Sequence, residues 1–168
     1  MPEIRSQGLN IHYTIEGTGT PLVLLHAGGS SSAQWRKLTP LLNDKFEIFA
    51  PDLIGFGATD SWSDDNALTH DHQANVVRDL IDSVAQDAVD IVGHSYGGAT
   101  ALRLATGHHK AIRRLILIEP IMTALLRTAG EDALFSELEA IAESFFAVAD
   151  ASQAESAWRG FIDYRNGV

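Results

Sequence analysis

A chain of 168 residues with 45% hydrophobic and 20% charged residues has the size of one globular domain and can bury a substantial core. Its net charge of −10 argues against a nucleic-acid partner and against docking on an anionic membrane, because no basic stripe is available to neutralise phosphates. The absence of cysteine excludes disulfides and thiolate metal sites, and we expect neither a metal nor a cofactor.

The N-terminal region predicts two strands joined by a turn. The first residues lack the charged and apolar regions of a signal peptide, and no apolar run approaches the ~20 residues that span a bilayer, so we expect a cytoplasmic protein. Residues 9–15 alternate apolar and polar side chains, and residues 22–26 form the continuous apolar run of a buried strand. Turn residues 17–21 connect them, so we expect an antiparallel opening pair.

Helices and strands alternate through the next hundred residues. A helix capped by Ser31 or Ser32 and ending near residue 42 is expected before a strand over residues 46–50. The pattern then predicts a helix from Thr69 to about residue 86, and the elements that follow it are a strand over 88–92, a helix ending near Gly107 and a strand over 112–118.

This alternation predicts an α/β fold, a mostly parallel sheet flanked by helices on both faces. Residues 121–168 break the alternation and show only helical patterns, around 125, over 134–148 and over 154–164. We therefore expect residues 1–120 to form the core and residues 121–168 to begin a helical cap.

A G-x-S-x-G pattern is the motif that carries chemistry. Gly93, His94, Ser95, Tyr96 and Gly97 stand between a predicted strand and a predicted helix, the setting of a nucleophile elbow. Such a turn exposes the serine above the sheet, and the small glycines let neighbouring backbone approach closely. A glycine-rich turn without chemistry, such as a phosphate cradle, is the alternative.

Two more segments occur in a familiar order. Residues 26–30 read His-Ala-Gly-Gly-Ser after a buried strand, and residues 52–57 read Asp-Leu-Ile-Gly-Phe-Gly after the next strand. With the elbow, these motifs resemble the N-terminal portion of the α/β-hydrolase superfamily, in its branch with a serine nucleophile. Ala27 departs from the glycine usual in the family.

The resemblance implies roles for individual residues. Ser95 would be the nucleophile, and the backbone amides of Gly28 and Tyr96 would form the oxyanion hole. His26 would brace its loop, and Asp52 would shape the loop beneath the site. No cofactor is implied.

The triad acid and base are harder to assign. Glu119 ends the strand after the elbow, where a branch resembling haloalkane dehalogenases places its acid, although this carboxylate could equally cap the following helix. His108 and His109, the only histidines after Ser95, lie ~20 Å from it along the expected helix. We expect the catalytic histidine beyond residue 168 and the 168-residue chain by itself to be inactive.

The expected function is acyl transfer from a small to medium ester, lactone or related carbonyl substrate to water, through a covalent intermediate on Ser95. A serine at the elbow disfavours the branches of the superfamily that use aspartate there, such as haloalkane dehalogenases and epoxide hydrolases. The alternative is a ligand-binding or degenerate member of the same fold that lacks the catalytic histidine. The expected partner is a small-molecule substrate, and the pattern does not indicate an oligomeric state.

Overall fold

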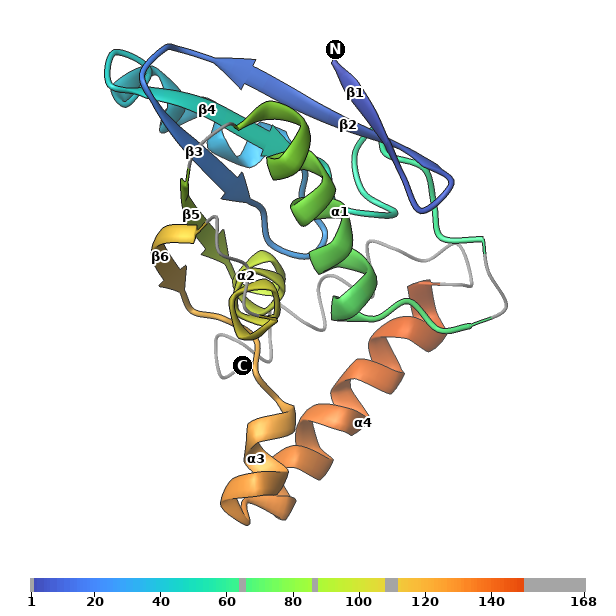
Figure 1. The fold of residues 1–168 in the computed structure, drawn as a ribbon. Helices are drawn as coiled ribbons and strands as arrows, with labels where there is room; N and C mark the ends of the chain where they lie inside the picture. Colours follow the sequence, from blue (N-terminus) through green and yellow to red (C-terminus); the bar gives the residue numbers. More distant parts are fainter. Residues whose placement is uncertain (1, 64–65, 86–87, 108–111, 150–168) are drawn as a thin grey trace. The chain divides into compact units, whose positions relative to one another are not determined.

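The computed structural model describes residues 2–63, 66–85, 88–107 and 112–149. The chain forms two compact units, Met1–Ile121 and Met122–Val168. The first unit is built on a six-stranded sheet (Figure 1). Its strands are β1 (Glu3–Ser6), β2 (Leu9–Glu16), β3 (Thr20–Leu25), β4 (Phe46–Pro51), β5 (Val89–His94) and β6 (Ile112–Ile118).

The sheet confirms the predicted α/β class. Its strand order is β1-β2-β4-β3-β5-β6, with parallel pairing from β4 through β3 and β5 to β6. The first two strands are antiparallel to their neighbours. The carboxyl ends of the parallel strands therefore meet at one edge of the sheet, where open α/β folds place their ligands.

The opening strands β2 and β3 run antiparallel as expected, but their expected pairing was wrong, because β4 lies between them. The turn after β2 packs on the segment that leads into β4, with the amides of Thr18 and Thr20 donating to the carbonyls of Asn43 and Lys45. The partner of β2 that the pattern missed is β1, joined through Gln7 and Gly8 at φ 50° and 81°. Positive φ at both turn residues is typical of a tight hairpin.

Helices cover one face of the sheet. α1 (His70–Val84) and α2 (Tyr96–Thr106) lie side by side (Figure 1), and their apolar faces pack with β3, β4 and β5 into the largest core cluster. Both agree with the predicted helices, although residues 86–87 lie outside the described part of the chain.

The other face of the sheet carries a second apolar cluster, which is centred on Trp35. Two short 3₁₀ helices cover this region, η1 (Ser32–Lys37), which contains Trp35, and η2 (Thr39–Leu41). We expected one continuous helix here. Ser31 does cap the first of the two short helices, because its side chain accepts a hydrogen bond from the amide of Ala33. Pro40 has no amide to donate and its ring would clash with the carbonyl one turn earlier, so the α-helix cannot continue.

The second unit contains α3 (Ala124–Ala129) and α4 (Asp132–Ala149). Gly130, at φ 78°, ends α3 in the left-handed conformation, and the Arg127 guanidinium lies 4.0 Å from the centre of the Phe135 ring. The helical pattern expected over 154–164 lies outside the described residues. Within the described part of the chain, no helix is long and apolar enough to cross a membrane.

Candidate active site

Ser95 lies in the sharp turn between β5 and α2. Its backbone adopts φ 53° and ψ −113°, a left-handed conformation that side chains rarely take. Its amide donates to the Ile118 carbonyl at 2.9 Å, and its carbonyl accepts from the amides of Ile121 at 3.2 Å and Ala99 at 3.0 Å. The end of β6 thus holds the strained serine from both sides of its backbone.

Glycines make this turn possible. A Cβ atom on Gly93 would lie 2.6 Å from the Gly97 carbonyl oxygen, and one on Gly97 would lie 2.5 Å from the carbonyl oxygens of Leu25 and His26. Both distances are below any real Cβ contact, so these positions exclude every other residue. The glycines of the motif therefore let α2 start directly against the end of β3.

That close approach brings two loops together. The Gly97 amide donates to the His26 carbonyl at 3.1 Å, and the Cβ of Tyr96 lies 3.6 Å from where a side chain would start on Gly28. Among the described residues, the amides of Gly28 and Tyr96 make no hydrogen bond, whereas the Ala27 amide donates to Gln34. An unpaired amide at the N-terminus of α2 and another in the neighbouring loop are suited to bind a developing oxyanion.

His26 is fully buried and holds the peptide that carries one of these amides. Its Nε2 accepts from the Leu53 amide at 3.0 Å, so the ring proton is on Nδ1, which donates to the Ala27 carbonyl at 2.7 Å. The Ala27 carbonyl and the Gly28 amide belong to one trans peptide and point in opposite directions. Burial lowers the pKa of His26, which keeps the ring neutral in this arrangement.

Asp52 organises the loop after β4. Its buried carboxylate accepts from the amide of Ser32 at 2.7 Å and from the amide of Ala58 at 2.9 Å, and its own carbonyl accepts from the Thr59 hydroxyl at 2.7 Å. Gly57, at φ 56°, packs directly on the carboxylate. Asp52 therefore ties its own loop to the start of η1.

The side chain of Tyr96 is enclosed by residues that the motif did not indicate. Its ring lies 5.9 Å from the Phe56 ring and 4.6 Å from the His70 ring, and its hydroxyl accepts from Gln73 at 3.3 Å. Burial raises the pKa of Tyr96 and lowers that of His70. The Nδ1 atom of His70 also lies 3.0 Å from the Thr100 hydroxyl. The helical period, which places residues 70, 73 and 77 on one face of α1, was the available signal.

Glu119 directly follows β6 and has φ 43°, another left-handed backbone. It is exposed, and it follows Ile118 and precedes Ile121, whose backbone groups bind Ser95. Topology thus places Glu119 at the sheet edge that carries Ser95. In the described part of the chain no histidine hydrogen-bonds to Ser95; His94 pairs with Gln34, and His108 and His109 lie outside the described residues.

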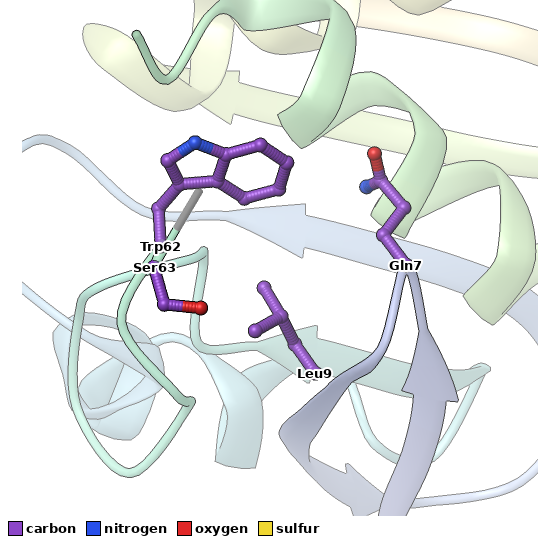
Figure 2. Close-up of a pocket in the computed structure, with 4 residues that line it drawn as sticks. All are labelled: Gln7, Leu9, Trp62 and Ser63. Carbon is purple, nitrogen blue, oxygen red and sulfur yellow. The ribbon is translucent and has the colours of Figure 1, made fainter. Parts of the chain in front are cut away.

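One cavity of about 200 Å³ is lined by Gln7, Leu9, Trp62 and Ser63 (Figure 2). The Trp62 ring beside it stacks on His72 at 4.2 Å. None of the predicted site residues lines this cavity. No group of three or more acidic or histidine side chains that could hold a metal occurs in the described ranges.

The alpha/beta hydrolase fold family model matches residues 20–160. The chain belongs to this family. This α/β hydrolase is similar to a soluble epoxide hydrolase of Corynebacterium sp. (strain C12). The two are 35% identical over 114 residues, which cover 68% of this chain and 39% of that protein. It is 31% identical over 147 residues to a 2-hydroxymuconate semialdehyde hydrolase of Pseudomonas sp. (strain CF600), covering 84% and 50%.

The solved structures of α/β hydrolases agree with the described fold. The structure of the epoxide hydrolase CorEH without ligand superposes with a TM-score of 0.67 at 32% identity, over 71% of this chain and 42% of that chain. A meta-cleavage product hydrolase, CumD with an A129V substitution, superposes with a TM-score of 0.63 at 28% identity, over 71% and 45%. The chain therefore spans about half the length, or less, of the relatives that it matches.

Proposed function

We propose that this α/β hydrolase transfers an acyl group from a carbonyl substrate to Ser95 and then to water. The observation that carries the proposal is the strained serine beside two amides without acceptors, those of Gly28 and Tyr96. The named hydrolases among its relatives support hydrolytic chemistry in general.

The chemistry follows from this geometry. The Ser95 hydroxyl oxygen adds to the carbonyl carbon and gives its proton to a base, while the two amides bind the oxygen that becomes negative. Collapse expels the leaving group, which takes the proton, and water then releases the acid and restores the hydroxyl. The base would be a histidine that none of the described residues supplies, with Glu119 the acid that orients it.

The serine argues for carbonyl substrates and against epoxides. A serine that opened an epoxide would become an ether, which water cannot readily cleave, whereas a carboxylate would form an ester that water hydrolyses. Addition to a carbonyl leaves an acyl ester on Ser95 that turns over. Esters, lactones and the ketones that undergo carbon–carbon hydrolysis all meet this requirement.

Reaction with a fluorophosphonate, followed by intact-protein mass spectrometry, tests the proposal. Because none of the described residues acts as a base on Ser95, we expect slow labelling of Ser95 that added imidazole accelerates, with none in the Ser95→Ala variant. Equal labelling of the two proteins, with and without imidazole, would contradict it. A non-catalytic ligand-binding protein would then be the better interpretation.

A further inference from the structure

Gln34 links the two loops that carry the oxyanion-hole amides. Its Oε1 accepts from the Ala27 amide at 3.0 Å, and its Nε2 donates to Nδ1 of His94 at 3.2 Å. Ala27 precedes Gly28, and His94 precedes Ser95. Both polar ends of this one side chain are therefore used, one on each side of the site.

The element that carries Gln34 is itself fixed. Trp35, the next residue, is buried in the core under η1, and the Ser32 amide at the start of η1 donates to the Asp52 carboxylate at 2.7 Å. The Ser31 hydroxyl caps the same turn. The side chain of Gln34 thus extends from a short helix that is fixed in place. Its two hydrogen bonds therefore restrict the positions of the two loops.

The bond to Ala27 also selects the oxyanion donor. With its amide bound to Gln34, Ala27 cannot donate to a substrate oxygen, and Gly28 is the next residue in the loop whose amide can. The carbonyl of Ala27 is held by the His26 ring, as described above. The two successive peptide units that lead up to Gly28 are therefore fixed, His26–Ala27 by Gln34 and Ala27–Gly28 by His26.

We propose that Gln34 is a positioning residue that sets the Gly28 amide relative to Ser95 and the Tyr96 amide. This inference rests on the proposed function of Ser95. Sub-ångström placement of such donors decides how strongly they stabilise the oxyanion, so loss of the bridge should slow bond formation and leave probe binding little changed.

The test compares Gln34→Leu, Gln34→Glu and the matched surface control Gln7→Glu in fluorophosphonate labelling with imidazole at one fixed pH. Gln7 donates to the His72 carbonyl, away from the elbow. We expect the maximal labelling rate of Gln34→Leu to fall by about tenfold, with an unchanged half-saturating probe concentration. Gln34→Glu keeps the acceptor for the Ala27 amide, so its maximal labelling rate should lie between those of Gln34→Leu and the parent chain. The rate of Gln7→Glu should match that of the parent chain.

Amide NMR spectra make the outcomes distinct from failure of the proposed function. Retained labelling in Gln34→Leu, together with lost exchange protection of the Ala27 amide, would overturn the positioning role. If even the parent chain does not label, the proposed function fails. The amide resonances of Gly28 and Tyr96 then test whether Gln34 positions these two amides. Their movement in Gln34→Leu but not in Gln7→Glu supports the inference, and unmoved resonances overturn it.

Discussion

At the scale of single residues, Ser95 has a strained backbone at the position that we propose for the nucleophile. Its φ of 53° is a conformation that glycine adopts freely and other residues adopt at a cost of about 1–3 kcal/mol. Neighbouring hydrogen bonds to Ile118 and Ile121 maintain it. Stability and nucleophile geometry are therefore opposed at this position.

Replacing Ser95 with glycine should accordingly stabilise the fold. We expect Ser95→Gly to raise the free energy of unfolding by about 1 kcal/mol relative to Ser95→Ala, which lacks the hydroxyl but keeps the strained Cβ. Urea denaturation of the two variants measures the difference. Equal stabilities would show that the backbone of Ser95 is not strained.

Replacing two glycines near Ser95 by alanine should destabilise the fold to very different extents. At Gly97 the new Cβ would meet the carbonyl oxygens of Leu25 and His26 at 2.5 Å, so we expect a loss of about 3 kcal/mol or more. At Gly28 it would meet Tyr96 at an ordinary 3.6 Å, and the loss should stay below about 1 kcal/mol. Thermal unfolding of both variants checks this, and a comparable loss at Gly28 would contradict the packing described.

The sequence motifs indicated only some of the residues that the structure brings together around Ser95. Ser95, Tyr96 and Gly28 were predicted from motifs, because a strand–turn–helix with small residues has few alternatives. Gln34, His70 and Gln73 were missed as site residues, because they act through contacts with elements distant in the chain. No local pattern encodes which loop a glutamine amide will reach.

At the scale of elements, Gln73 joins α1 to the loop after β4. Its fully buried amide exchanges hydrogen bonds with the backbone of Ile54 at 2.9 and 3.2 Å and donates to the Tyr96 hydroxyl. A side chain of α1 thus satisfies the backbone hydrogen-bonding groups of Ile54, which lie in a loop and have no neighbouring strand to pair with.

Removing this amide should be costly. Gln73→Leu would leave the Ile54 amide and carbonyl buried without partners, and we expect a loss of about 2–4 kcal/mol in the free energy of unfolding. Gln7→Leu, which removes one exposed hydrogen bond, should cost less than about 0.5 kcal/mol. Denaturant titration of both variants tests this; a small effect at Gln73 would mean that water can replace its amide.

Element types were predicted better than their details. The core strands and the helices after Thr69 and Ser95 were recognised, since apolar periodicity is set by burial. The continuous helix expected before residue 42 was wrong because Pro40 outweighs the apolar spacing. The β1–β2 hairpin was missed because Gln7-Gly8 lacks the usual Asn-Gly or Asp-Gly signal.

At the scale of the whole molecule, strand order was beyond the sequence pattern. Alternation predicted a mostly parallel sheet, but nothing in residues 9–26 indicated that β4 would lie between β2 and β3. That arrangement depends on the packing of Gly17 and Gly19 against the backbone of residues 43–46, a contact between distant segments.

Two buried histidines should make global stability depend on pH. Burial lowers the pKa of His26 and His70 below 6.5, so between the folded and unfolded pKa values the unfolded chain binds more protons. The free energy of unfolding should therefore hold steady above pH 6.5 and decrease as the pH falls below it. The slope is at most about 1.4 kcal/mol per pH unit for each histidine, and smaller for half-buried His70, where solvent screens the charge.

Urea titrations at several pH values measure this dependence, and His70→Gln is the informative variant because it removes one of the two ionisable rings. We expect a shallower decrease below pH 6.5 for this variant than for the parent chain. An identical slope in both proteins would assign the whole effect to other groups.

The hydrogen bonds around Ser95 also bear on how the protein is made. The Ser95 amide needs the Ile118 carbonyl, and its carbonyl needs the Ile121 amide, so groups more than twenty residues downstream complete the turn. During synthesis the ribosome releases β5 and α2 before these groups leave the exit tunnel. The nucleophile turn therefore takes its final shape only after β6 has emerged and paired, so the nascent chain passes through a stage in which the serine is present but its geometry is not yet set.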